Sequence, residues 1–267
     1  MPEGPSILIL RETLARFTGA VVREAGGRVA LDLTRLRHRR LLAVRSWGKH
    51  LLLEFDGFSL RLHLLLLGSC RIGDATTPST GAPAVSLQFD DGTRLDFHSV
   101  SAKWVEGNLD AHYDGSADIL SPAWDAEAAH GKLRTTPHTL VCDALLDQAI
   151  FAGVGNIIKN EVLFRVRIHP LSRLGALPDP LLARMIDETR IYGFDFLAWK
   201  RQNVLKRHWQ VHEQRTCPLC HRALARIAQL GKRRRRSFHC DHCQAFHVLP
   251  TLFDASLRKH ASGNAPA

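Results

Sequence analysis

The residues that follow the initiator methionine, Pro2 and Glu3, carry groups that suit covalent chemistry on a carbonyl-like carbon. Removal of Met1 would leave Pro2 with a secondary α-amine, and an α-amine titrates near ~8, well below the ~10.4 of lysine. More of it is therefore a neutral nucleophile at physiological pH, and its attack on an aldehyde carbon yields an iminium that stays cationic because it has no N–H to lose. Glu3 would lie within reach to move a proton. The alternative is a disordered terminus without a chemical role.

Four of the six cysteines lie near the C-terminal end in two CxxC pairs that 19 residues separate. Two such pairs match the spacing of a structural site in which four thiolates surround one Zn²⁺ ion. Disulfides are disfavoured because we expect a cytoplasmic protein. The neighbouring histidines at positions 221, 239 and 242 are alternative ligands, and Cys70 and Cys142 lie in apolar runs typical of a core. The predicted zinc ligands are Cys217, Cys220, Cys240 and Cys243.

The segment between the cysteine pairs, ARIAQLGKRRRRSF, predicts two short strands joined by a turn around Gly231. A hairpin held at its base by zinc would carry the basic cluster of residues 232–236 at its tip. A rigidly placed basic cluster favours contact with a DNA backbone. The alternatives are a solvated patch or an import signal.

A second candidate anion site lies in the segment FAGVGNIIKNEV. Gly153 and Gly155 permit a tight turn, and Asn156 is a good N-cap for the helix that the following residues predict. Backbone N–H groups at such a helix start bind phosphate well. The short glycine motif is weak evidence by itself, because other helix-turn-helix hairpins look similar.

The chain has 267 residues, of which 45% are apolar, with a formal net charge of +10 and a pI near 9.8. This length is enough for one large or two medium domains. The positive charge favours a polyanionic partner, of which nucleic acid is the commonest. No run approaches the ~20 apolar residues that cross a bilayer, and the first residues lack the pattern of a secretion signal. We therefore expect a cytoplasmic protein with no membrane association.

Patterns along the chain predict an α+β protein with two domains. Apolar residues recur at helical spacing from Ile7 to Phe17, which predicts a helix near the start. Short alternating apolar runs with turn pairs such as Asp56-Gly57 follow, and they predict a β-sandwich. Helical patterns then continue to about Lys206. The predicted organisation is a β-sandwich catalytic domain at 1–115, a linker at 116–126, a helical domain at 127–210, a zinc finger at 211–248 and a flexible tail at 249–267.

Four segments, in this order and spacing, resemble the formamidopyrimidine-DNA glycosylase and endonuclease VIII family of base-excision repair enzymes over nearly the whole chain. They are PEGP, WGKHLLLEF, LLDQAIFAGVGNIIKNEVLFRVRIHP and the finger CPLC…RSFHCDHC. The resemblance implies a helix–two-turn–helix motif in the helical domain and a β-hairpin zinc finger. It also implies a bifunctional DNA glycosylase and AP lyase that excises oxidised bases from damaged double-stranded DNA. We expect a monomer that associates with the bacterial nucleoid when it acts on DNA.

The roles of individual residues follow from the same resemblance. Pro2 resembles the nucleophile that attacks C1′ of the damaged nucleotide, and Glu3 the acid/base that assists opening of the sugar ring. Lys49 is similar to the β-hairpin lysine that contacts the phosphate and sugar of the lesion. Asn156 resembles the phosphate-binding asparagine of the two-turn motif, and Arg235 the finger arginine that grips phosphates at the lesion.

Two further residues complete the predicted DNA interface. Lys159 lies in the two-turn segment, and Leu66 lies in the cluster Leu65–Leu67, where the family places the side chain that fills the hole left by an extruded nucleotide. Ordinary strand core is the alternative for these leucines.

Because the iminium acidifies the C2′ proton, the resemblance implies loss of the 3′ phosphate by β-elimination and then a δ-elimination on the 5′ side.

PEGP and LLDQA resemble the endonuclease VIII branch, which removes oxidised pyrimidines, and FHSVSAKW lacks the Arg-Arg-Phe intercalating motif of the purine branch. Ser6 departs from many relatives, which carry a further glutamate there, so rate and substrate range are in question. The alternatives are a member that acts on oxidised purines such as 8-oxoguanine and formamidopyrimidines, and a catalytically silent protein that binds lesion DNA. A zinc-finger regulator or ribosome-associated protein is also possible, although PEGP then has no function.

Overall fold

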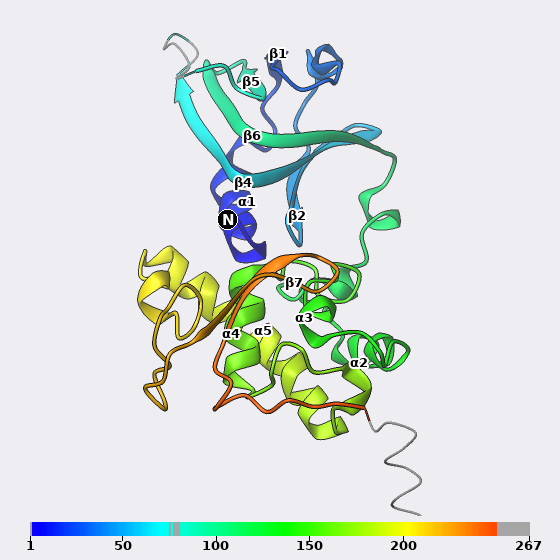
Figure 1. Ribbon diagram of the computed structural model, residues 1–267. Helices are drawn as coiled ribbons and strands as arrows, with labels where there is room; N and C mark the ends of the chain where they lie inside the picture. Colours follow the sequence, from blue (N-terminus) through cyan, green and yellow to red (C-terminus); the bar gives the residue numbers. More distant parts are fainter. Residues whose placement is uncertain (1, 75, 77–80, 250–267) are drawn as a thin grey trace, which may run out of the picture. The chain divides into compact units, whose positions relative to one another are not determined.

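The computed structural model describes residues 2–74, 76 and 81–249 of the chain (Figure 1). The chain forms two compact units, and each is assembled from segments that are not contiguous in the sequence. Apart from Leu249, the predicted flexible tail lies outside the described residues. Unit 1 comprises Met1–Asp125, Phe151–Gly155 and Gly193–Arg207, and unit 2 comprises Ala126–Ile150, Asn156–Tyr192 and His208–Ala267.

Unit 1 combines one longer helix with short 3-10 turns and a set of strands. The helix α1 (Gly4–Leu14) has a proline in its first turn, where the missing N–H costs nothing. The short helices are η1 (Ala15–Phe17), η2 (Leu33–Leu36), η3 (Leu109–Ala111) and η4 (Gly115–Ala117). The strands are β1 (Val22–Gly26), β2 (Ala43–Trp47), β3 (His50–Phe55), β4 (Phe58–Asp74), β5 (Val85–Phe89) and β6 (Thr93–Glu106).

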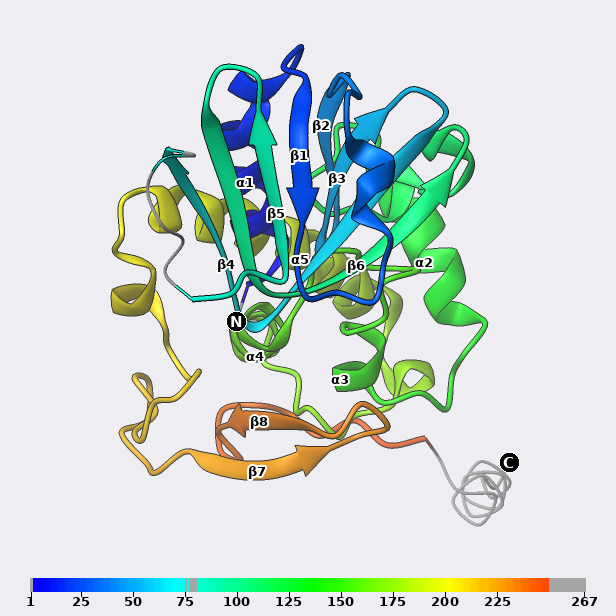
Figure 2. The same ribbon diagram turned by 90° about the horizontal axis from the view of Figure 1, so that it is seen from above.

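The strands of unit 1 pair in the order β1-β5-β6-β4-β3-β2, all antiparallel, as one sheet (Figure 2). The long strands β4 and β6 carry shorter partners at opposite ends, because β3 pairs with residues 58–63 of β4 and β5 pairs with residues 94–97 of β6. Apolar side chains from both ends nevertheless belong to a single core. The sheet therefore folds over on itself, as a sandwich requires.

The core of unit 1 follows the alternation of its strands. Val85, Leu87 and Phe89 of β5 are fully buried, and the residues between them are half-buried. This period of two places one face of the strand against the core. The same core receives Ile7 of α1 and Phe17 of η1, whose ring stacks on that of Phe89 at a centroid distance of 5.2 Å.

A wide bulge interrupts the pairing of β4 with β6. Leu64 pairs with Val100 and Ser69 pairs with His98, so residues 65–68 stand opposite Ser99 alone. The extra residues leave the apolar side chains at positions 65, 66 and 67 outside the core, with 46%, 66% and 80% of their surface exposed. A Cβ at residue 68 would lie 2.7 Å from the Leu64 Cβ, so the bulge closes only with glycine there.

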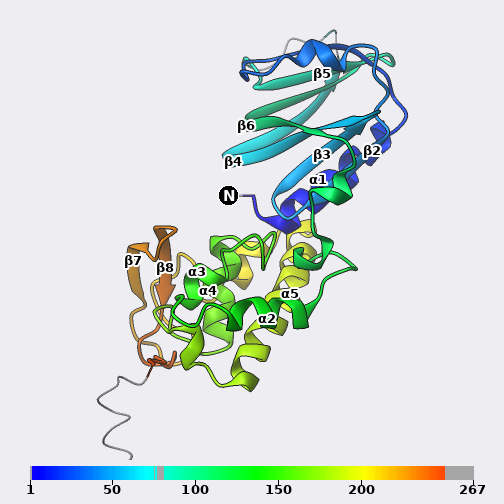
Figure 3. The same cartoon turned by 90° about the vertical axis from the view of Figure 1, so that its right-hand side faces the viewer.

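Unit 2 is mainly helical and ends in a β-hairpin (Figure 3). Its helices are α2 (Ala126–Arg134), α3 (Val141–Ala144), α4 (Asn156–Arg165), η5 (Leu174–Ala176) and the first part of α5 (Asp179–Arg201). The residues of α5 from Gly193 onward belong to unit 1. Most of η6 (Leu205–His208) belongs to unit 1 as well. The strands of the hairpin are β7 (Ala225–Leu230) and β8 (Arg235–His239).

Helix α4 is buried on all sides from residue 157 to residue 164, including three consecutive polar residues. Such residues are tolerated only with hydrogen-bond partners. The Glu161 carboxylate accepts the backbone N–H groups of Gln210, Val211 and His212 at 2.9, 3.0 and 2.8 Å. Burial raises the pKa of Glu161, and these three hydrogen bonds oppose that rise.

The hairpin of β7 and β8 packs on α4 through a small apolar core. Phe238 of β8 and Phe164 of α4 are its aromatic members, and the remaining buried members are Val211, Cys217 and Cys240. The predicted α+β class is thus confirmed, with an N-terminal β-sheet domain, a helical domain and a cysteine-bearing hairpin. Within the described ranges, no helix has both the length and the apolar character to cross a membrane.

Candidate functional site

The N-terminal residues of unit 1 are fixed in place by the loop Phe151–Gly155. Glu3 is fully buried, with extended backbone angles of φ −119° and ψ 174°, and α1 begins at the next residue. The Glu3 carboxylate accepts the backbone N–H of Gly155 at 3.0 Å. Pro2 is half-buried at the start of this anchored segment. The hydrogen bond to Gly155 satisfies this buried carboxylate and so anchors the segment.

Glycines allow the backbones around Glu3 to approach closely. The Gly4 N–H donates to the Gly153 carbonyl at 2.9 Å, and a Cβ on Gly4 would lie 2.8 Å from the Gly153 Cα. A Cβ on Gly155 would lie 2.3 Å from the Glu3 carboxyl carbon. These distances are shorter than any real Cβ contact, so the sequence GVG in this loop serves close packing as well as turn formation.

The hairpin of β2 and β3 brings Lys49 to the same loop. Trp47 pairs with His50, so Gly48 and Lys49 form a two-residue turn, and Gly48 has a φ of 53° that suits glycine. A Cβ on Gly48 would lie 2.9 Å from the Gly153 nitrogen. The Glu3 carboxylate and the turn that carries Lys49 therefore both contact the loop Phe151–Gly155.

Asp118 holds the turn that carries Lys49, and no sequence pattern indicates this role. One of its carboxylate oxygens accepts the Gly48 N–H at 2.8 Å, and the other accepts the Leu120 N–H at 2.9 Å. The Asp118 side chain is mostly buried. Nothing in the surrounding DGSADIL distinguishes this carboxylate from a surface acid, because its partner lies 70 residues away.

Two histidines next to Lys49 are also absent from the sequence prediction. His50 and His63 are paired across β3 and β4, with ring centroids 5.6 Å apart. Burial lowers the pKa of His50 to about 4, and the positive charge of Arg61 adds to this effect. Burial followed by the charge of Lys49 lowers the pKa of His63. Both rings are therefore neutral at physiological pH and add no positive charge beside Lys49.

Three of the predicted DNA contacts lie on different elements. Asn156 is the first residue of α4, and its Oδ1 is buried without a hydrogen-bond partner among the described residues. Leu66 lies in the exposed bulge of β4. Arg235 is the exposed first residue of β8, and in the described part of the chain its guanidinium has no hydrogen-bond or salt-bridge partner.

Lys159 is placed differently from the other predicted DNA contacts. Only 1% of its surface is exposed, and its ammonium donates to the Arg236 carbonyl at 3.0 Å and to the Ser237 hydroxyl at 3.4 Å. Both partners lie on β8 of the hairpin. The ammonium is thus directed into unit 2, where it joins α4 to the hairpin, and a direct contact with DNA would require it to leave these partners.

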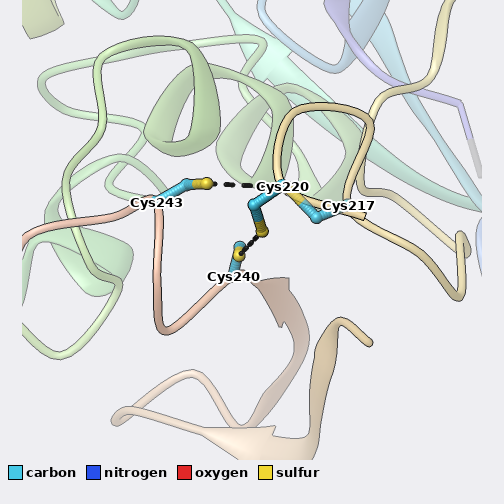
Figure 4. A group of neighbouring side chains, drawn as sticks. All are labelled: Cys217, Cys220, Cys240 and Cys243. Atoms are coloured by element: carbon cyan, nitrogen blue, oxygen red, sulfur yellow. Dashed lines mark hydrogen bonds between the residues drawn. The ribbon is translucent and has the colours of Figure 1, made fainter. Parts of the chain in front are cut away.

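The four cysteines of the two CxxC pairs converge at the base of the hairpin (Figure 4). The Cys217 and Cys243 sulfurs are 3.8 Å apart and the Cys220 and Cys240 sulfurs 3.5 Å apart. A tetrahedral metal ion with metal–sulfur bonds of ~2.3 Å has sulfur–sulfur edges of about 3.8 Å. The backbone N–H of Arg222 lowers the pKa of Cys220 to about 7, whereas burial raises the pKa of Cys240 and Cys243. The cluster could therefore hold one metal ion.

Neighbouring histidines are occupied elsewhere. Asp241 accepts hydrogen bonds from the Nε2 atoms of His169 and His239 at 3.3 and 3.0 Å. The Nδ1 of His169 lies 3.3 Å from the Leu171 N–H, which it accepts, so its proton belongs on Nε2. Hydrogen bonding to Asp241 accounts for this group without a metal ion.

Comparison with known proteins places this arrangement in a defined class. The model of the formamidopyrimidine-DNA glycosylase N-terminal domain matches residues 1–101, and that of the formamidopyrimidine-DNA glycosylase H2TH domain matches residues 116–190. A formamidopyrimidine-DNA glycosylase of Methylococcus capsulatus is 31% identical over 274 residues, which cover 91% of this chain and 100% of that protein. The chain belongs to the formamidopyrimidine-DNA glycosylase family, as the sequence resemblance indicated.

Other relatives match at lower coverage or lower identity. Endonuclease 8-like 3 of Mus musculus is 30% identical over 206 residues, or 75% of this chain, and the chain spans 34% of that protein's length. Lactococcus lactis formamidopyrimidine DNA glycosylase bound to DNA with an abasic site has a TM-score of 0.80 and 20% identity, covering 91% of this chain and 99% of that one. The same enzyme also has structures with DNA containing an oxidised pyrimidine and DNA containing N7-benzyl-Fapy-dG. At this identity the likeness shows the fold.

The lowered pKa of His50 predicts acid sensitivity of unit 1. The unfolded chain binds a proton at this ring near pH 6.5, whereas the folded chain binds it near pH 4, so the unfolded state holds more protons between these values. The free energy of unfolding should therefore fall as pH decreases from about 6.5 to about 4. His50 should contribute less than about 1.4 kcal/mol per pH unit to this slope, because it binds one proton and its ring is partly exposed. The lowered pKa of His63 adds to the slope in the same direction. Urea unfolding followed by tryptophan fluorescence at a series of pH values measures it.

His50→Phe should reduce this slope and preserve the aromatic packing with Trp47, whose ring centroid lies 5.8 Å from that of His50. Thr18→Gln is the control, since Thr18 is exposed in the same unit and carries no ionisable group, so the change should leave the slope unchanged. An unchanged slope in His50→Phe would show that this ring does not titrate as stated.

Proposed function

We propose that this chain is a bifunctional DNA glycosylase and AP lyase that removes oxidised bases from damaged double-stranded DNA. The observation that carries the proposal is the buried carboxylate of Glu3, the residue next to Pro2. The Gly155 N–H fixes this carboxylate. Membership of the formamidopyrimidine-DNA glycosylase family supports it. DNA as the partner agrees with the net charge of +10, and it implies a cytoplasmic protein at the nucleoid.

The proposed reaction begins with the secondary amine of Pro2 after removal of Met1. Its nitrogen forms a bond to C1′ of the damaged nucleotide, the bond from C1′ to the base breaks, and the base leaves with a proton from water. The Glu3 carboxylate removes the N–H proton of the new ammonium and passes it to the ring oxygen of the sugar. The C1′–oxygen bond then breaks as the nitrogen lone pair forms the iminium, and the ring opens. Loss of a C2′ proton expels the 3′ phosphate, and a second elimination releases the 5′ side, so phosphate termini remain on both flanks.

We assign positioning of the lesion strand to Lys49, Asn156 and Arg235. The two-residue turn that presents Lys49 is fixed by Asp118, and the Arg235 guanidinium is exposed. Asn156 starts α4, where helix N–H groups favour a phosphate. Lys159 receives a different role, because its buried ammonium binds β8 and so holds the hairpin that carries Arg235.

The bulge of β4 is our candidate for the element that fills the hole left by an extruded nucleotide. Its three leucines are exposed although their removal from water would be favourable, and the cost of unstacking a base is a few kcal/mol. Insertion of Leu66 into the stack would bury its side chain and offset part of this cost. Leu67 is more exposed than Leu66, so either side chain can serve.

Oxidised pyrimidines are our proposed substrates, and oxidised purines are the alternative. The absence of an Arg-Arg-Phe motif in FHSVSAKW supports the first. The fold does not separate the two, since the Lactococcus lactis enzyme has structures with both an oxidised-pyrimidine DNA and an N7-benzyl-Fapy-dG DNA. A catalytically silent lesion-binding protein would share the fold and would retain Met1.

We further propose that the four-cysteine cluster holds a structural Zn²⁺ ion. The sulfur–sulfur distances of 3.5 and 3.8 Å suit a tetrahedral four-thiolate site, and such closed sites are typical of zinc. A bound ion would stabilise the base of the hairpin and take no part in the reaction.

Trapping with borohydride tests the nucleophile. Mixed with DNA that contains an abasic site, the processed protein should give a covalent complex on a denaturing gel, because borohydride reduces the iminium. Pro2→Gly should lower the initial rate of complex formation by about tenfold or more, equivalent to about 1.4 kcal/mol in the barrier. Pro83→Gly, a like change in a loop of unit 1, should leave the rate unchanged.

Two further measurements keep this test decisive. Mass spectrometry of the purified protein shows whether Met1 is removed, and a retained Met1 with no trapped product would favour the silent binding protein. Persistent trapping by protein whose terminal amine is acetylated would identify a lysine as the nucleophile and refute the role of Pro2.

Removal of one thiolate tests the metal. Cys217→Ser should lose one equivalent of zinc in elemental analysis and loosen the hairpin, because three remaining thiolates bind the ion more weakly. Cys70→Ser changes a half-buried thiol outside the cluster and should retain the zinc. Wild-type protein that binds no zinc, and gains no thermal stability from it, would exclude the proposed site.

A panel of lesions tests the substrate class. Single-turnover cleavage should be at least about tenfold faster with duplexes that contain thymine glycol or dihydrouracil than with 8-oxoguanine, a difference of about 1.4 kcal/mol in the barrier. A duplex with an undamaged base is the control. Faster cleavage of 8-oxoguanine would reverse the assignment to pyrimidines.

A further inference from the structure

We infer that Asp143 is a positioning residue that holds the turn of the finger hairpin, so that Arg235 meets a DNA phosphate. The inference rests on the proposed function in DNA binding and names a residue outside every site assigned above. Asp143 lies on α3, far in sequence from the hairpin, and nothing in the sequence around it predicted this role.

The Asp143 carboxylate binds the backbone of the hairpin turn directly. One oxygen accepts the Lys232 N–H at 2.9 Å, and the other accepts the Arg233 N–H at 3.2 Å. The side chain is 8% exposed, so these bonds form with little competition from water. A carboxylate that accepts two N–H groups fixes both the position and the direction of the turn.

The turn is built to fit this carboxylate. Gly231 has a φ of 69°, and a Cβ there would lie 2.4 Å from the nearer Asp143 oxygen. Any larger residue would both strain the backbone and displace the carboxylate. The glycine thus brings the turn against α3, and the hairpin tip is held at a defined place on unit 2.

A second set of contacts, made by α4, holds β8 in place. The Lys159 ammonium binds the Arg236 carbonyl, and the Asn160 Oδ1 accepts the Ser237 hydroxyl at 3.3 Å and the Phe238 N–H at 3.4 Å. Both α4 residues are 1% exposed. Arg235 therefore lies between two anchored points, the turn on Asp143 and the strand on α4.

The five cations of the tip are not equivalent. The Arg233 guanidinium lies 3.7 Å from the Asp147 carboxylate, and Arg234 donates its Nε–H to the Gln229 side-chain oxygen at 2.7 Å. These two contacts hold their guanidinium groups against the protein. Among the described residues, the side chains of Lys232, Arg235 and Arg236 form no hydrogen bond or salt bridge. They are the tip cations available to a polyanion.

The direction in which removal of a carboxylate charge changes DNA affinity distinguishes positioning from simple electrostatics. A carboxylate near the tip repels phosphate, so removal of its charge should strengthen DNA binding if charge alone matters. If Asp143 acts by placing Arg235, its removal should weaken binding instead. Asp147 provides the matched control, because this acid lies beside the same tip. Among the described residues it accepts no backbone N–H of the turn.

The experiment compares Asp143→Asn with Asp147→Asn in the full-length protein. Affinity for a duplex with a tetrahydrofuran abasic-site analogue is measured by fluorescence anisotropy from about 50 to 200 mM salt. Asp143→Asn should bind about five- to tenfold more weakly, with a slope of log K against log salt that is shallower by about 0.9, the value of one phosphate contact. Asp147→Asn should bind as tightly as wild type or more tightly.

Two additional measurements show that the loss acts through Arg235. Arg235→Ala should give the same shallower slope, Arg233→Ala should leave the slope unchanged, and Asp143→Asn combined with Arg235→Ala should bind no more weakly than Arg235→Ala alone. In the free wild-type protein, hydrogen exchange should show protected amides at residues 232 and 233, and Asp143→Asn should accelerate their exchange. Retained zinc content verifies that the base of the hairpin stays folded.

The outcomes that overturn the inference differ from those that overturn the proposed function. Asp143→Asn binding as tightly as Asp147→Asn, or unprotected wild-type amides at residues 232 and 233, would remove the positioning role. Wild-type protein without preference for the lesion duplex would refute the proposed function itself. If Asp143→Asn does not fold, the amide protection in wild-type protein still decides.

Discussion

The close packing of three backbone segments in unit 1 is the constraint on which the candidate site depends. Gly4, Gly48 and Gly153 approach at distances that exclude a Cβ, and the Gly155 N–H fixes the Glu3 carboxylate. A hydrogen bond to a buried carboxylate is costly to break, because the charge would remain without a partner. The packing therefore holds the N-terminal segment and the turn of Lys49 against one loop, and it leaves little freedom for either.

Buried polar contacts have the same purpose in unit 2. Three consecutive polar residues of α4 bind backbone groups of other segments, and Asp143 does so from α3. Apolar packing alone is not directional, whereas a carboxylate or ammonium with fixed partners defines one arrangement. The hairpin is short and has a core of few residues, so these contacts, together with the cysteine cluster at its base, supply the rigidity that the proposed DNA contact at its tip requires.

Some of the proposed contact residues are exposed side chains on a tightly held backbone. The leucines of the β4 bulge and the Arg235 guanidinium lie on the surface, and in both cases the neighbouring backbone is tightly held, by Gly68 in the bulge and by Asp143 at the tip. Groups that must meet a ligand gain from such support, because less conformational entropy is lost on binding. Lys159 contributes to this support from inside unit 2, where its ammonium binds β8.

The sequence by itself determined the family, the α+β class and the convergence of the four cysteines, because each follows from local spacing: CxxC pairs, alternating strands, and a glycine turn before a helix. It also predicted a role for Glu3 from its place beside Pro2, whereas it predicted a role for Lys49 through the resemblance alone. Only the tertiary structure revealed Asp118, His50 and Asp143, and only it placed the ammonium of Lys159 inside the protein. For Asp118, Lys159 and Asp143 the physical reason is that their hydrogen-bond partners lie 70 to 89 residues away, and no local pattern encodes a contact at that separation. For His50 the reason is burial, the main cause of its lowered pKa, which the residue types around it do not report.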